Sequence, residues 1–192
     1  MPYLTETEVR ERAARVTQPL RKTAASVLTE DRASASDTFD VFLSHSSAEP
    51  EEILLGIKAF LEDAGLKVYV DKYSDPYLSP EAVTRETAVV LRGRMRQSLT
   101  LLYVHSQHST KSRWMPWELG FFDGYKGRVG IFPVTRYQEE AFRGEEYLNL
   151  YPCVDRATTR NGIEKLWINR SENEYSQLYS WAKGSSEIQV HS

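Results

Sequence analysis

An apolar stretch in the middle of the chain decides the fold class, and it reads Ser98-Leu99-Thr100-Leu101-Leu102-Tyr103-Val104-His105. A strand with one face in solvent alternates apolar and polar residues, whereas a strand buried on both faces of a parallel sheet is apolar almost throughout. This stretch is of the second kind. We therefore expect it to be a buried strand of a parallel sheet.

Strand and helix patterns alternate on both sides of this stretch. Further strands are expected at residues 39–44, 66–71 and 129–134, with a fifth at 151–154. Helices are expected from Pro50 to just before Gly65, over Ala82–Met95 after a Ser79-Pro80 start, over 116–125, and after a Ser171-x-x-Glu174 cap. Such alternation with short connections predicts an α/β fold, a flavodoxin-like doubly wound parallel five-stranded sheet.

The first 36 residues follow a different pattern. Thr5 and Glu8 have the spacing of a capping box at the start of a helix. Apolar residues then recur at steps of three or four, as on one helix face: Val9, Ala13, Val16, Leu20, Ala24 and Val27. Pro19 should kink this helix or divide it in two, and residues 30–37 have the composition of a linker. We expect the apolar face to pack on the main body or on a partner subunit.

These patterns divide the chain into three parts. We expect a helical N-terminal extension and linker over residues 1–36, a main domain over 37–184 that ends in a C-terminal helix, and a tail over 185–192. The length of 192 residues, with 41% hydrophobic and 27% charged residues, suits one globular core rather than two.

Charge and cysteine content limit the classes of function. The 24 basic and 27 acidic residues give a net charge of −3, so there is no electrostatic reason to expect nucleic acid as a ligand. No apolar run approaches the roughly 20 residues that cross a bilayer, and the first residues do not resemble a secretory signal. Cys153 is the single cysteine, which excludes an internal disulfide framework. We expect a soluble, cytoplasmic protein that binds neither membrane nor nucleic acid.

A ligand of such a sheet binds beyond the carboxyl ends of its strands. The segments to search are therefore Ser44–Glu49, Asp71–Pro80, His105–Glu118 and Arg136–Leu150. They contain neither a glycine-rich dinucleotide fingerprint nor a phosphate loop. The four histidines lack zinc-ligand spacing, so no metal site is expected. Cys153 lies in an apolar stretch and is interpreted as a small buried side chain rather than a nucleophile.

Residues 112–120 are the most informative of these segments, because they combine two tryptophans with a glutamate. Pro116 should begin a helix and so place Glu118 in its first turn, where the helix dipole favours a carboxylate. Because glutamate is favoured in the first turn of any helix, composition alone leaves two interpretations open. Glu118 could be structural, or it could be functional. Trp117 is likewise open to a role in the core.

Four segments, in this order, resemble a Toll/interleukin-receptor (TIR) domain of the kind common in bacterial proteins. Phe39–Ser47 resembles the opening strand and loop of that family, and Gly65–Asp71 resembles its second strand. Ser109–Leu119 resembles the segment with the Trp-x-x-x-Glu element, and Val129–Val134 resembles the fourth strand. The resemblance covers about residues 38–155.

The resemblance implies one of two functions, because some TIR domains are adaptors while others cleave the nicotinamide–ribose bond of NAD. The enzymatic members release nicotinamide and form ADP-ribose or a cyclised isomer, and the Glu of the Trp-x-x-x-Glu element is catalytic. That residue corresponds to Glu118 here, with Trp114 as its aromatic partner. NAD is then the substrate, and neither a cofactor nor a metal is required.

The resemblance also implies further residues of an NAD site. Phe42, Ser44 and His45 should border the pocket at the end of the first strand, although His45 is equally well explained as a turn residue bonded within its own loop. Asp71 begins the loop after the second strand, which lines the site in the family, and Tyr77 should contribute in the same way.

As a small TIR-like protein, this chain resembles the TIR proteins that act in bacterial antiphage (Thoeris-like) defence. There a cyclic ADP-ribose product signals to a separate effector, and the family self-associates through TIR–TIR contacts. One departure concerns Ala48-Glu49, where many bacterial members carry an acidic residue and a lysine, so no phosphate contact is assigned to this loop. Two alternatives remain: a non-catalytic TIR adaptor acting through residues 71–80, and a nucleoside deoxyribosyltransferase-like enzyme.

Overall fold

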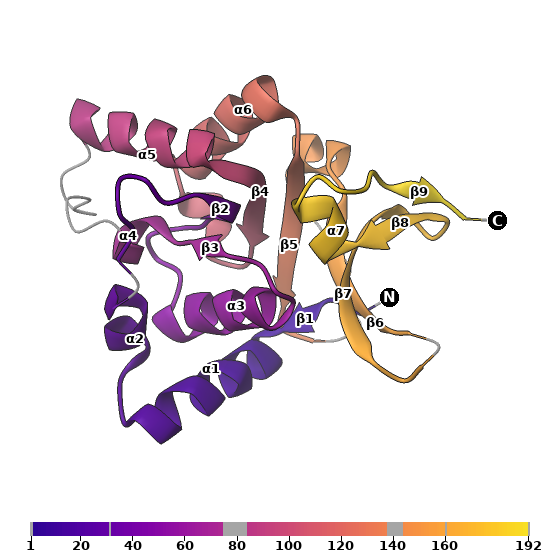
Figure 1. Ribbon diagram of the computed structural model, residues 1–192, viewed down its shortest axis with the longest axis horizontal. Coiled ribbons are helices and arrows are strands. Elements are labelled where there is room, and N and C mark those ends of the chain that lie inside the picture. The colour runs from indigo at the N-terminus through magenta and orange to yellow at the C-terminus, as the bar shows by residue number, and fades with distance from the viewer. Residues whose placement is uncertain (1, 31, 75–83, 138–143, 160, 192) are drawn as a thin grey trace.

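Five parallel strands form the centre of the sheet, in the order β3-β2-β4-β5-β6. The computed structural model describes residues 2–30, 32–74, 84–137, 144–159 and 161–191 (Figure 1). The strands are β2 (Phe39–Ser44), β3 (Val68–Tyr69), β4 (Ser98–His105), β5 (Val129–Thr135) and β6 (Cys153–Thr158). The predicted α/β fold is confirmed, with a five-stranded parallel sheet as its core.

Strand β4 is buried on both faces, as its apolar run predicts. Residues 100–104 are each at most 1% exposed. Because successive side chains point to opposite faces, Leu102 and Val104 enter one hydrophobic cluster while Leu101 and Tyr103 enter another. The sheet thus separates two cores.

Helices cover both faces of the parallel strands (Figure 1). Helix α3 (Glu51–Asp63) contributes to one core, while α5 (Arg85–Gln97) and α6 (Met115–Lys126) contribute to the other. A short helix, α4 (Asp71–Ser74), follows β3. The expected helix start at Ser79-Pro80 lies outside the described residues, and α5 is capped by a reciprocal pair of bonds between Thr84 and Thr87. None of the helices described is long and apolar enough to cross a membrane.

The N-terminal segment is part of the same fold. Strand β1 (Leu4–Thr5) pairs in parallel with the end of β5, and it leads into α1 (Glu6–Leu20) and α2 (Ala24–Glu30). The predicted capping box between Thr5 and Glu8 is confirmed. The break between the helices comes at Arg21, whose φ of 51° is left-handed.

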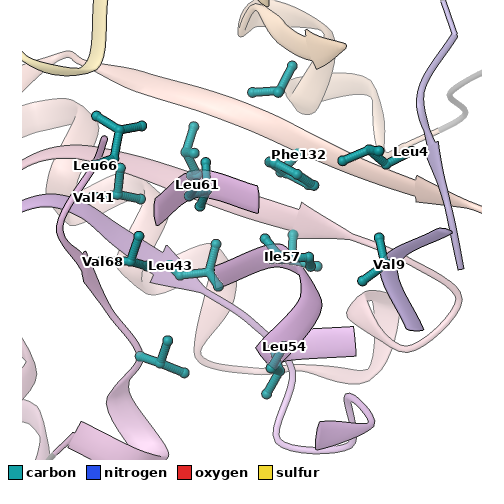
Figure 2. Packing of buried hydrophobic residues seen from close by; sticks show 14 of the residues in the cluster. Leu4, Val9, Val41, Leu43, Leu54, Ile57, Leu61, Leu66, Val68 and Phe132 are labelled. Carbon is teal, nitrogen blue, oxygen red and sulfur yellow. The ribbon is translucent and has the colours of Figure 1, made fainter. Parts of the chain in front are cut away.

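Helix α1 packs against α3 through its buried residues Val9 and Ala13. Figure 2 shows this packing, with side chains of α3 gathered between those of the sheet and Val9. The expected apolar face does not extend to the end of α1, because Leu20 is 51% exposed.

The C-terminal region differs from expectation. Ser171 and Glu174 do not cap a helix but are paired across the turn of a hairpin formed by β7 (Glu164–Ser171) and β8 (Glu174–Gln177). Strand β7 also pairs antiparallel with β6, and β9 (Gln189–Val190) pairs with β8. These strand pairings override the capping signature, so helix α7 (Leu178–Ala182) begins only at Leu178. In the described residues the five-stranded core is therefore part of a nine-stranded mixed sheet.

Candidate functional site

Glu118 and Ser44 meet at the carboxyl ends of the parallel strands. Ser44 is the last residue of β2, and Glu118 lies in the first turn of α6, whose N-cap is Trp114. The Ser44 hydroxyl donates a hydrogen bond of 2.5 Å to Oε2 of Glu118. Both residues are buried, with 1% and 2% of their surface exposed. The fold thus holds a carboxyl group in an enclosed position at the edge where such sheets bind ligands.

The environment of Glu118 favours its neutral form. Burial raises its pKa, the charge of Asp71 adds to this, and the hydrogen bond from Ser44 and the charge of His45 oppose it, leaving a pKa of about 8. Without a ligand, the group is therefore mostly a carboxylic acid at neutral pH. A positive charge beside it would favour the carboxylate.

His45 carries the opposite charge within the same cluster. Its Nδ1 lies 3.0 Å from the carbonyl oxygen of Ser46, and its Nε2 forms an ion pair with Oδ1 of Asp71 at 2.7 Å. Burial lowers the pKa of His45, but the charge and contact of Asp71, with smaller effects of Ser46 and Glu118, raise it to about 9. His45 is thus an imidazolium at neutral pH, held between Glu118 and Asp71.

Four of the residues singled out in the sequence therefore come together. Ser44, His45, Asp71 and Glu118 form a buried polar group, called here the Glu118 cluster. Its members come from the end of β2, the following loop, the start of α4 and the first turn of α6.

The predicted aromatic residues take different places. Trp114 lies one turn before Glu118. The backbone amide of Glu118 donates a hydrogen bond of 2.9 Å to the carbonyl oxygen of Trp114. Its ring is half-buried and meets Trp117 edge-on, with ring centroids 5.2 Å apart. Phe42 is fully buried and stacks on Tyr69 at 5.3 Å, so it belongs to the core rather than to the Glu118 cluster. Tyr77 lies outside the described residues.

A second buried carboxyl group lies near this cluster, and the sequence pattern did not single it out as a site residue. The Ser106 hydroxyl donates to Oε2 of Glu49 at 2.6 Å, and both residues are under 5% exposed. Burial raises the pKa of Glu49, while the Ser106 bond, His108 and His45 oppose the rise. Both residues follow the carboxyl ends of strands, which is the signal that could have found them. Their pairing across 57 residues is not visible in the sequence.

Tyr103 adds a further polar group, close enough to Glu118 for the two to interact electrostatically. Burial raises the pKa of its phenol, and Tyr147, Glu145 and Glu118 contribute to the rise. Tyr147 belongs to a 3-10 turn, η2 (Glu146–Leu150), so that segment also approaches the cluster.

Comparison with known proteins places these features in a family. The pattern of the TIR domain matches residues 41–167. A relative from Bacillus cereus (strain MSX-D12), named probable 3' cyclic ADP-D-ribose synthase ThsB', is 42% identical over 145 residues, which cover 74% of this chain and 75% of that protein. A protein from Cytobacillus dafuensis, named putative cyclic ADP-D-ribose synthase TIR2, is 37% identical over 84 residues, which are 43% of this chain and 22% of that one.

A solved structure is also similar, the TIR domain of the Toll-related receptor TRR-2 from Hydra magnipapillata. It shares 20% identity and a TM-score of 0.42 over 58% of this chain and 79% of its own. The family itself is established by the matched pattern and by the Bacillus relative. The chain belongs to the TIR-domain family.

Proposed function

We propose that this protein is an enzyme that cleaves the nicotinamide–ribose bond of NAD, with Glu118 as the catalytic residue. The observation that carries the proposal is the buried Glu118 carboxyl, held by Ser44 at the ligand-binding edge of the sheet. Two relatives named as cyclic ADP-D-ribose synthases support the same reaction class.

The reaction breaks the bond between the ribose C1′ and the ring nitrogen of nicotinamide. The bonding electron pair leaves with nicotinamide, which becomes neutral, and positive charge develops on the ribose in an oxocarbenium-like state. A Glu118 carboxylate can accept hydrogen bonds from ribose hydroxyls and stabilise that charge. Water attacking C1′ and losing a proton gives ADP-ribose, whereas attack by a hydroxyl or ring nitrogen of the same molecule gives a cyclic isomer.

The neighbours of Glu118 have distinct parts in this proposal. Ser44 orients the carboxyl group through its hydrogen bond and favours its ionised form. The cationic nicotinamide ring of the substrate favours that form further, so that substrate binding itself charges Glu118. His45 and Asp71 hold the cluster together as an ion pair, and Trp114 provides an aromatic face for a ring of NAD. Tyr77 is assigned a substrate contact from the family resemblance.

The biological setting is part of the proposal as well. A cyclic ADP-ribose isomer would act as a signal in antiphage defence and be read by a separate effector. The protein would act in the cytoplasm and self-associate through TIR–TIR contacts. NAD is the substrate, and the reaction as written needs neither metal nor cofactor.

The test is incubation of the purified protein with NAD, with nicotinamide release followed by chromatography and the second product identified by mass spectrometry. Glu118→Gln should lower the rate at least about a hundredfold, because it removes the charge that stabilises the transition state. Glu11→Gln, the same change at an exposed position of α1, is the matched control and should leave the rate unchanged.

Turnover that survives in Glu118→Gln would refute the site assignment. Absence of turnover in the wild type, even at high protein concentration, would favour the adaptor function. Cleavage of deoxynucleosides in place of NAD would indicate the deoxyribosyltransferase-like reaction.

A further inference from the structure

A hollow of about 800 Å³ lies on the antiparallel part of the sheet, and none of its lining residues belongs to the Glu118 cluster. Its floor is one face of β6, β7 and β8. The strand register places Asp155 opposite Trp167, and Asn169 opposite both Cys153 and Tyr175, so these side chains share that face. The alternate residues of β7, Leu166 and Ile168, are buried in the core on the other face.

The hollow contains buried polar atoms without partners. Asp155 is 6% exposed, and its Oδ1 makes no hydrogen bond with any residue that the structure describes. The same holds for both the oxygen and the nitrogen of the Asn169 side-chain amide. Buried polar atoms are almost always hydrogen-bonded, so three unpaired ones on one wall point to a ligand that donates and accepts there. Burial also raises the pKa of Asp155, while the neighbouring Asn169 side chain opposes the rise.

Two aromatic rings form the rest of this wall. Trp167 and Tyr175 meet edge-on, with centroids 5.6 Å apart. The Trp167 ring is fixed by a hydrogen bond from Nε1 to the carbonyl oxygen of Ala157, and Tyr175 is fixed by stacking on His191 at 3.9 Å. Rings held in this way, and only half-buried, are suited to contact with a planar ligand.

We propose that this hollow binds the heterocyclic ring of a nucleotide, one that has an amino donor beside an acceptor atom. A side-chain amide matches such an edge with two hydrogen bonds, as asparagine does with adenine. Asn169 would make this pair, Asp155 Oδ1 would accept from the amino group, and Trp167 and Tyr175 would contact the ring. Arg170, exposed on the rim, is placed to meet a phosphate. A pocket of this volume is within the usual range for small-molecule sites.

The site can be tested apart from NAD cleavage with adenosine 5′-monophosphate, which has no nicotinamide to lose. Calorimetric titration of the 192-residue Glu118→Gln chain should show binding of this nucleotide. Adding Asn169→Ala should weaken binding about tenfold or more, because two hydrogen bonds are lost. Adding Asn161→Ala, at an exposed position in the β6–β7 connection and outside the hollow, should leave binding unchanged.

Hydrogen exchange of the wild-type chain provides a second measurement that does not depend on a folded variant. The nucleotide should slow exchange in residues 153–158 and 164–171.

Guanosine monophosphate and nicotinamide mononucleotide, titrated into the Glu118→Gln chain, distinguish the rings. Tighter binding of either nucleotide would support the site and identify the ring that it prefers. The proposal is overturned if none of the three nucleotides binds, if Asn169→Ala binds as well as its parent, or if inorganic phosphate binds equally well.

Discussion

At the scale of single residues, the charge state of Glu118 should control the pH dependence of NAD cleavage. Its pKa is raised to about 8, and the proposed mechanism needs the carboxylate. Since a raised pKa means that the charged form is lost as the pH falls below 8, kcat/KM should increase from pH 6 to pH 8. The measurement is the kcat/KM for NAD across this range. A profile that is flat between pH 6 and pH 8 would contradict the assignment.

Ser44→Ala tests the hydrogen bond that opposes this shift. The Ser44 hydroxyl stabilises the ionised Glu118, so its removal should raise the pKa of the carboxyl group and move the acid limb of the profile to higher pH. The kcat/KM at pH 7 should fall about tenfold, which corresponds to the free energy of one hydrogen bond to a charged group. The difference in kcat/KM between Ser44→Ala and the wild type should become smaller above pH 9.

A matched control lies two residues away. Ser46→Ala removes a hydroxyl that accepts a hydrogen bond from the Ala48 amide but does not bond Glu118, so it should leave the acid limb of the pH profile in place.

Asp71→Asn should shift the acid limb in the opposite direction to Ser44→Ala, because it removes a negative charge that raises the pKa of Glu118. If Ser44→Ala and Asp71→Asn shifted the limb the same way, the proposed electrostatics of the cluster would be wrong.

At the scale of elements, the capping box of α1 makes a separate prediction. Thr5 and Glu8 satisfy each other's backbone amides at the start of this helix. Thr5→Ala should therefore lower the free energy of unfolding by about 1 kcal/mol, measured by urea denaturation. Thr7→Ala, an exposed position in the same first turn, should have little effect or stabilise slightly, because alanine favours the helix. Equal losses in both variants would argue against the cap.

The elements also show which parts of the structure the sequence could predict. The apolar run of β4 and the capping box of α1 are signals that depend on neighbours in the chain, and both were confirmed. The cap expected at Ser171 and Glu174 was wrong because the pairing of β7 with its neighbouring strands β6 and β8 decides the structure there, and a local capping signature does not report that pairing. Strand β1 has only two residues, too few to show any periodicity.

The candidate site also contains residues that the sequence could locate and features that it could not show. The family resemblance located Glu118, Ser44, His45 and Asp71, which the fold brings together. Sequence spacing could not show that Phe42 faces the core, since its strand is apolar on both faces. It also could not show the pairing of Glu49 with Ser106, which depends on the register between β2 and β4 and on the loops that follow them.

At the scale of the whole molecule, the N-terminal helices and the sheet share one core. Leu4, Val9, Ala13 and Leu28 all lie in the hydrophobic cluster that also holds the inner face of α3. The backbones of α1 and α3 approach closely at Gly56, where a Cβ atom would overlap the carbonyl oxygen of Val9. The absence of a side chain at this position is therefore what allows α1 to dock.

Gly56→Ala tests this docking directly. The added methyl group must push α1 away from α3, because the atom it meets is backbone, and we expect a loss of about 1–3 kcal/mol in the free energy of unfolding. Gly93→Ala is the matched control in α5, since a Cβ there meets nothing within 4 Å. The control should gain about 0.5–1 kcal/mol, because alanine favours a helix over glycine. Urea denaturation of both variants gives the comparison. If Gly56→Ala were as stable as Gly93→Ala, the N-terminal helices would be held only loosely, and the shared core would not be a property of the protein in solution.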